Sequence, residues 1–176
     1  ENNFGLASSV SLIKQPVLGV IDDSAHGLGL ELLLASDVRI CASKSKFSMA
    51  HVAHGAIPSD GGTQRLPRLV GQGRALEIIL TGRVVGAQEA LEMGMVHQVC
   101  DADPLKDAYC IAEKIAAHGP RAAQYLKEAV YTGSDMTLRQ GMSLEADMSV
   151  ILQSTLDRIE GINSFLERRP PNFKGD

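Results

Sequence analysis

The amino-acid sequence predicts an α/β core followed by an all-helical C-terminal region. Short β-branched runs typical of strands alternate with helical segments as far as residue 99. From Pro104 onward, four helical segments follow one another, and no strand-like run interrupts them. Strands that alternate with helices, followed by helices alone, are typical of this architecture. We therefore expect two domains, residues 1–103 and residues 104–176.

The elements of the first region follow from hydrophobic periodicity and from turn residues. Apolar residues at helical spacing predict a helix from Phe4 to Lys14, and Pro16 stops it. A glycine-rich turn over Ser24–Gly29 leads into a Leu-rich helix over Leu30–Ala35. Further helices are predicted over 63–70, 71–80 and 87–93, and strands over 16–21, 37–42, 46–49 and 96–99.

The second region is predicted to contain only helices and a tail. The four helical segments cover residues 104–117, 120–131, 136–152 and 155–167. The tail, Arg168–Asp176, is polar and interrupted by Pro170 and Pro171. We expect it to lie on the surface or against a partner.

Composition argues against several classes of function. The chain has 17 Lys and Arg against 21 Asp and Glu, with 4% aromatic residues and no Trp, so we expect no nucleic-acid partner. Its longest apolar run, Leu28–Ala35, is interrupted by Glu31 and is far shorter than the ~20 residues that cross a bilayer, so we expect no membrane segment. The three cysteines are scattered, which predicts reduced thiols and no metal site.

The first residues of the sequence lack the pattern expected of a targeting signal. Glu1 is not an initiator Met, and an amphipathic run follows it directly. We interpret the chain as N-terminally incomplete. We expect a cytoplasmic protein, or a mitochondrial one if a transit peptide lies upstream.

The segment from Ser24 to Asp37, SAHGLGLELLLASD, is the strongest candidate site. Glycines at the start of a helix let backbone N–H groups approach an anion, such as the oxygen of a thioester that becomes an enolate. Glu31 lies about one turn into the same helix, within reach of such a group. The alternative is purely structural, because the helix dipole favours an acidic residue in a first turn.

Several linked motifs then resemble the crotonase superfamily of enoyl-CoA hydratases and isomerases. They are PVLGVIDDSAHGLGLELLLASDVRICASKSKFSM, GAIPSDGGTQRLPRLVGQGRALEIILTGRVVGAQEALEMGMVHQV and the closing EGINSFLERRPPNFKGD. The resemblance runs from about Pro16 to Asp176. It implies a partial crotonase-type ββα spiral core followed by a helical trimerisation region, and therefore a homotrimer or a dimer of trimers. It also implies an acyl-CoA substrate that itself carries the coenzyme A, with no separate cofactor.

The resemblance assigns roles around the predicted helix start. The family's glycine triplet falls on Gly27, Leu28 and Gly29, so the amides of Leu28 and Gly29 would form the oxyanion hole. The family's other oxyanion donor belongs to a loop upstream of Glu1. Glu31 matches the first of two glutamates that hydratases use as general acid and base, and His51 stands where the second is expected.

His51 leaves three alternatives open. Imidazole exchanges protons near neutral pH, so a pair of Glu31 and His51 could activate water and protonate the α-carbon. The resemblance also implies isomerase or decarboxylase relatives in which a single carboxylate suffices. In the third alternative, His51 only hydrogen-bonds a backbone carbonyl beside the pocket.

Ser59 and Asp60 occupy a position where the family usually has a small residue. We favour a cap for the helix that follows, because Ser and Asp are preferred caps. Alternatively, one of them meets a polar acyl group or supplies a replacement carboxylate. His26 and His54 flank the same region and, beside Gly27, indicate a more polar pocket than a fatty-acyl substrate requires.

Three residues near the C-terminus match the family's coenzyme A contacts. Phe165 followed by Arg168 and Arg169 resembles the aromatic and basic residues that touch the adenine or phosphates. The helix dipole alone also favours arginines at a helix C-terminus.

The sequence as a whole predicts an acyl-CoA lyase that adds water to, or removes it from, an α,β-unsaturated CoA thioester. One alternative is an enoyl-CoA isomerase, or another enolate-forming enzyme that uses Glu31 alone. Another is a degenerate relative that binds but does not catalyse.

Overall fold

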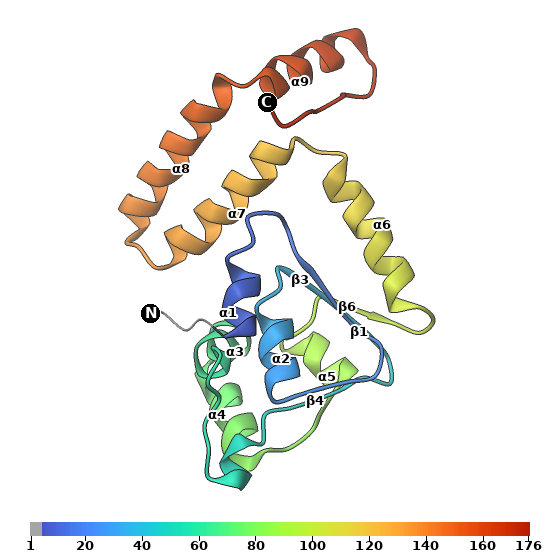
Figure 1. The fold of residues 1–176 in the computed structure, drawn as a ribbon, viewed down its shortest axis with the longest axis vertical. Helices are drawn as coiled ribbons and strands as arrows, with labels where there is room; N and C mark the ends of the chain where they lie inside the picture. Colours follow the sequence, from blue (N-terminus) through green and yellow to red (C-terminus); the bar gives the residue numbers. More distant parts are fainter. Residues whose placement is uncertain (1–4) are drawn as a thin grey trace. The chain divides into compact units, whose positions relative to one another are not determined.

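The computed structural model describes residues 5–176, which form two compact units. One contains the described residues up to Ile13 together with Val17–Cys110, and the other contains Lys14–Pro16 and Ile111–Asp176. The division after Cys110 falls within helix α6, Pro104–Ala116, which Figure 1 labels. The domain division after residue 103 stays a prediction.

The first unit holds two small sheets of three strands each. In one, β3 (Val38–Ala42) lies between β1 (Leu18–Ile21) and β6 (Gln98–Cys100), and all three are parallel. In the other, β4 (Lys46–Ser48) pairs in parallel with β2 and antiparallel with β5. Strands β2 and β5 span Ser24–His26 and Val85–Gly86.

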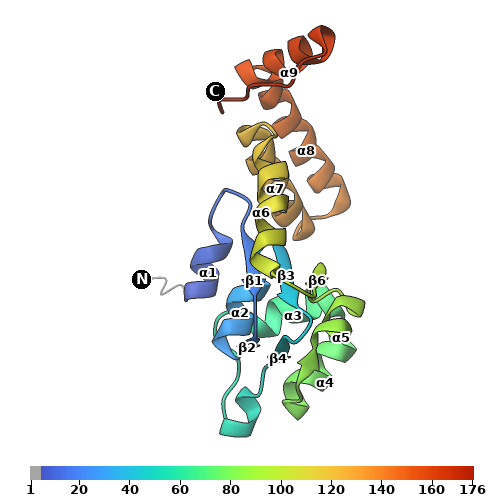
Figure 2. The ribbon, with the colours of Figure 1, turned by 90° about the vertical axis from the view of Figure 1, so that its right-hand side faces the viewer.

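Helices connect these strands, because parallel strands require crossover connections. Helix α2, Leu28–Leu34, joins β2 to β3 and packs beside α1, Leu6–Ser11 (Figures 1 and 2). The other helical elements of the unit are η1 (His51–His54, a 3₁₀ turn), α3 (Gly62–Val70), α4 (Gln72–Thr81) and α5 (Ala87–Glu92).

The hydrophobic core of this unit surrounds α2 and β4. Leu30, Leu33 and Leu34 from α2 are buried in the same core cluster as Phe47 of β4. The Leu-rich run of the sequence therefore supplies the core, as its helical spacing requires. Glu31 is the one charged residue of that run, and it is buried with its neighbours.

The second unit consists of helices and the returning tail. Helices α7 (Pro120–Ser134) and α8 (Leu138–Gln153) form a hairpin, whose second helix begins with a capping box. Helix α9 is Leu156–Glu167. The tail turns back along it, because the amides of Lys174 and Gly175 donate to the Asp157 carboxylate at 2.7 and 2.9 Å.

The predicted α/β core and helical C-terminal region are confirmed, and the differences are local. Ser24–His26 is a strand, not part of a turn, because its pairing with β4 decides its conformation. The helix predicted from Phe4 begins at Leu6, and Phe4 lies outside the described residues. The two-residue strand Val85–Gly86 and the turn His51–His54 are too short to give a periodic signal. No helix within residues 5–176 is long and apolar enough to span a membrane.

Candidate active site around Glu31

Glu31 is a buried carboxylate that backbone amides hold in place. Its side chain belongs to the first turn of α2 and is 1% exposed. Oε1 accepts hydrogen bonds from the N–H groups of Asp60 and Gly62, both at 2.8 Å. A buried carboxylate needs such donors to offset the loss of water. Oε2 accepts no hydrogen bond from the described residues, and this leaves it available to a substrate.

The turn before α3 brings its two amides to the same oxygen. Gly61 adopts a φ of +97°, a left-handed conformation that residues with a side chain rarely occupy. Gly62 is closely packed, since a Cβ there would lie 2.8 Å from Met49 and from Pro58. The glycine pair is therefore required by the geometry that holds Glu31.

Asp60 is buried, and its carboxylate is turned toward α1. Oδ2 accepts the Ala7 N–H at 2.6 Å, and Oδ1 accepts the N–H and the hydroxyl of Ser8 at 3.0 and 2.8 Å. Burial acts to raise the pKa of Asp60, but these hydrogen bonds and the nearby Arg65 charge outweigh it, so the pKa lies below its usual range.

The expected helix cap at Ser59 or Asp60 is therefore wrong for the helix that follows. Gly61 occupies the N-cap position of α3, and no side chain caps that helix. Asp60 instead satisfies free amides at the start of α1, more than fifty residues earlier in the chain. Ser59 is exposed. The local sequence could not show that the Asp60 side chain binds the start of α1 and not the start of the helix that directly follows it.

The start of α2 presents two unused amides. Gly27, with φ +52°, is the N-cap residue, and its own N–H donates to the Ser48 carbonyl at 3.0 Å. Neither Leu28 nor Gly29 donates its N–H to any described residue, because the first amides of a helix have no partner within it. The side chain of Leu28 is exposed. These amides are thus free to meet an oxyanion.

His51 lies beside the same helix start. A Cβ on Gly27 would come within 3.7 Å of both Cε1 and Nε2 of the His51 ring. Nδ1 of this ring is buried and finds no hydrogen-bond partner among the described residues. Buried polar atoms of this kind are rare and call for a functional or ligand explanation. The structural alternative requires a hydrogen bond to a backbone carbonyl, and Nδ1 makes none among the described residues.

The remaining predicted pocket residues lie at the surface. His26 is exposed on β2, and its Nδ1 lies 2.7 Å from the Ser48 hydroxyl. His54 is exposed at the end of η1. Within residues 5–176, no group of His, Cys, Asp and Glu could hold a metal ion.

The three candidate coenzyme A contacts belong to the second unit. Phe165 is 82% exposed, and Arg168 is exposed at the end of α9 with a φ of 55°. Arg169 is engaged by Glu160 and Glu167, each at 2.5 Å, and the guanidinium holds the pKa of Glu160 down at about 2. Arg168 is therefore the freer cation of the two.

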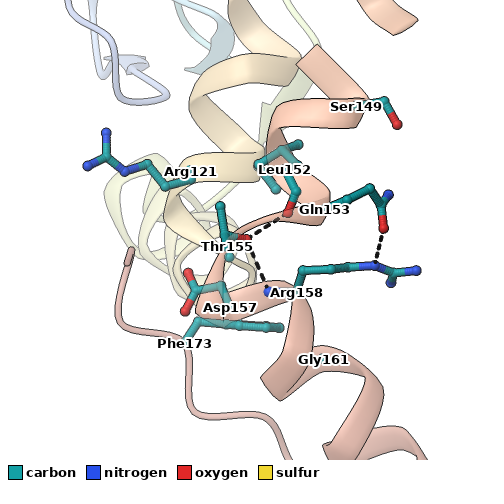
Figure 3. A pocket seen from close by; sticks show the side chains of 11 residues that line it. Arg121, Ser149, Leu152, Gln153, Thr155, Asp157, Arg158, Gly161 and Phe173 are labelled. Atoms are coloured by element: carbon teal, nitrogen blue, oxygen red, sulfur yellow. Dashed lines mark hydrogen bonds between the residues drawn. The ribbon is translucent and has the colours of Figure 1, made fainter. Parts of the chain in front are cut away.

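A hollow of about 430 Å³ also lies in the second unit, where α8 passes into α9 (Figure 3). Three of its lining residues are joined by hydrogen bonds. The Thr155 hydroxyl accepts the backbone N–H of Arg158, and the Arg158 side chain donates to the Gln153 side chain. None of the residues predicted for the site lines it.

Comparisons with known proteins show what this chain is similar to. The enoyl-CoA hydratase/isomerase family model matches residues 1–176. The chain is 39% identical to a mitochondrial enoyl-CoA hydratase of Pongo abelii, covering 92% of this chain and 56% of that protein. It is 35% identical to the 2,3-dehydroadipyl-CoA hydratase of Escherichia coli strain K12, covering 97% and 67%. A crystal structure of an enoyl-CoA hydratase from Bacillus anthracis superposes with a TM-score of 0.91 at 41% identity, covering 97% and 66%. The chain thus spans about half to two thirds of the length of these relatives.

Proposed function

Because this chain belongs to the enoyl-CoA hydratase/isomerase family, we propose that the protein containing it adds water to an α,β-unsaturated CoA thioester, or removes it. The observation that carries the proposal is the environment of Glu31. A buried carboxylate with one oxygen fixed and the other open lies in the same helix turn as two unused amides. Acid–base chemistry next to a developing oxyanion needs this combination.

The proposed hydration begins with the substrate carbonyl at the amides of Leu28 and Gly29. Glu31 Oε2 takes a proton from water as the water oxygen bonds to the β-carbon. The electron pair of the double bond moves to the thioester oxygen, where the amides stabilise the enolate. A proton then reaches the α-carbon in one of two ways, and the carbonyl re-forms. Glu31 returns the proton that it took, or protonated His51 donates one, after which Glu31 loses its proton to solvent and His51 regains one from solvent. Dehydration follows the same steps in reverse.

His51 distinguishes a two-residue mechanism from one that uses Glu31 alone. Its position beside Gly27 and its unpartnered Nδ1 support a direct role. We expect His51→Ala to lower kcat by about 10²-fold or more if the imidazole transfers a proton. A rate equal to that of the unsubstituted protein would assign the chemistry to Glu31 alone. His51→Gln is the control that preserves a polar side chain.

The second unit is proposed to serve coenzyme A binding and assembly. Phe165 and Arg168 are exposed and free to meet an adenine and a phosphate. The hairpin of α7 and α8 exposes apolar side chains, among them Leu126 and Met142, which supports burial against another subunit.

A substrate panel tests the proposed function. Crotonyl-CoA, 2,3-dehydroadipyl-CoA and a 3-enoyl-CoA are each incubated with the whole protein that contains this chain. The products are separated by liquid chromatography and identified by mass spectrometry. We expect a gain of one water on at least one 2-enoyl-CoA. Migration of the double bond without water would favour the isomerase alternative. Tight binding without any turnover would favour a catalytically degenerate relative.

A further inference from the structure

The conformation of the Glu31 side chain depends on a turn that α2 does not contain. Both hydrogen bonds to Oε1 come from backbone amides of the segment 60–62. The carboxylate therefore follows any displacement of this turn. A shift of only about 1 Å can lower an enzymatic rate by about 100-fold, because reacting groups must meet in a narrow geometry.

The turn itself is fixed to α1 by the side chain of Asp60. Its carboxylate receives the amides of Ala7 and Ser8 and the Ser8 hydroxyl. Asp60 thus uses its backbone N–H to hold Glu31 and its side chain to hold α1. No other described residue makes both of these contacts.

Two further residues show that this connection is closely fitted. A Cβ on Gly5 would lie 2.3 Å from the Asp60 carboxylate, so only glycine permits the approach of α1. Arg65 donates to the Asp60 carbonyl at 2.7 Å and to the Ser11 hydroxyl at 3.2 Å. Helix α1 is therefore attached to the turn near both of its ends.

We infer that Asp60 is a positioning residue: by binding the start of α1 it fixes the turn whose amides orient the Glu31 carboxylate. The inference rests on the proposed acid–base role of Glu31. It gives Asp60 a role other than contact with an acyl group, and it makes α1 part of the support of the site.

The test measures kcat and KM of the Asp60→Asn and Gly5→Ala variants of the whole protein that contains this chain. The substrate is crotonyl-CoA or whichever substrate of the panel is turned over. In Asp60→Asn, the single amide oxygen cannot accept all the hydrogen bonds that the carboxylate accepts. In Gly5→Ala, the added methyl group pushes α1 away while Asp60 itself is unchanged. We expect either change to lower kcat between about 10- and 100-fold. KM should change less than about threefold, because substrate contacts remain.

A double substitution separates positioning from general destabilisation. If Asp60 acts through Glu31, adding Asp60→Asn to Glu31→Gln should leave the residual rate unchanged within about twofold, since the group to be positioned is already gone. Glu89→Gln is the control. Its carboxylate accepts hydrogen bonds from the Arg83 guanidinium at 2.7 and 3.0 Å in the same compact unit, and we expect kcat to stay near that of the unsubstituted protein.

The outcomes are distinct. Unchanged kcat in folded Asp60→Asn and Gly5→Ala would overturn the inference, as would losses that multiply in the double substitution. If Asp60→Asn does not fold, Gly5→Ala alone decides. If Glu31→Gln keeps the full rate, the proposed function fails first, and this result differs from an active Asp60→Asn beside an inactive Glu31→Gln.

Discussion

The two compact units differ most in how many large apolar side chains they bury. Both hold a buried carboxylate on backbone amides, and in the second unit that carboxylate is Asp157. In the first, Phe47 and Leu30 are fully buried, and two carboxylates are buried with hydrogen bonds from backbone amides. In the second, large apolar residues lie on the surface, such as Leu138, which is 81% exposed, and the acidic Glu160 meets arginine near the surface. The described core cluster belongs to the first unit, whereas few apolar residues of the second unit are buried.

This difference supports the proposal that the first unit carries the chemistry. A reacting carboxylate must be held in one orientation and shielded from water, and only a packed core with satisfied polar groups provides both. Exposed helices suit association and the binding of a long, flexible ligand. The predictions below test this division.

The largest expected effect compares two phenylalanines. Phe47→Ala should lower the free energy of unfolding by about 3–5 kcal/mol, because it opens a cavity in the core of the first unit. Phe165→Ala should change it by less than about 0.5 kcal/mol, because that ring is already in solvent. Urea titration followed by circular dichroism measures both. Equal losses would show that the second unit has a core of its own.

The next prediction concerns the exposed face of α7 and α8. Leu126→Gln combined with Met142→Gln should weaken self-association at least tenfold, since each buried side chain contributes about 1.5–3 kcal/mol. Sedimentation velocity over a range of concentrations measures the change. Leu76→Gln, on an exposed residue of the first unit, serves as the control. An unaltered association constant in the double variant would place the interface elsewhere.

The buried carboxylate of Asp60 and the surface carboxylate of Glu160 should differ in their effect on stability in acid. The pKa of Asp60 is lower in the folded protein than in the unfolded chain, so its contribution is complete near neutral pH and is lost as pH falls through the folded value. Asp60→Asn should therefore lower stability by about 1–3 kcal/mol at pH 7, with a smaller difference below about pH 4.

Glu160→Gln, at a half-buried carboxylate on the surface, provides the comparison for this acid response. The ion pair of Glu160 with Arg169 lies at the surface, so its effect should be small and should disappear in high salt. Thermal unfolding across pH and ionic strength measures both variants. A Glu160→Gln effect as large and as salt-resistant as that of Asp60→Asn would remove the contrast between the units.

The smallest expected effect concerns the freer arginine of α9. Arg168→Gln should raise KM for a CoA thioester by up to about tenfold and leave kcat unchanged, because one charge-assisted phosphate contact would be lost. With the same acyl group carried on pantetheine, which lacks the nucleotide, KM should be equal for Arg168→Gln and for the unsubstituted protein. An equal KM for the CoA substrate in both proteins would exclude this role.

Much of this account could be predicted from the sequence because the signals are local. The Leu-rich run gave α2 and the core, and the glycines around Leu28 gave a helix start with free amides. The position of Glu31 in the first turn of that helix followed from the same spacing. The helices of the second unit followed from their periodicity, to within a few residues at each end.

The unpredicted features depend on contacts between distant residues. Asp60 is followed directly by a helix, yet its carboxylate binds α1, which only the folded chain brings near. Ser24–His26 resembles a turn until β4 supplies a partner. The unpartnered Nδ1 of His51 likewise depends on packing that no local pattern reports.

The most direct test of the central claim is the hydration rate of crotonyl-CoA by Glu31→Gln. Gln keeps an oxygen that can accept the amides of Asp60 and Gly62, so the variant should fold and melt like the unsubstituted protein. It cannot take a proton from water, and kcat should fall by about 10²- to 10⁴-fold. A folded variant that hydrates crotonyl-CoA at the unsubstituted rate would show that the buried carboxylate supports the structure and does not perform the chemistry.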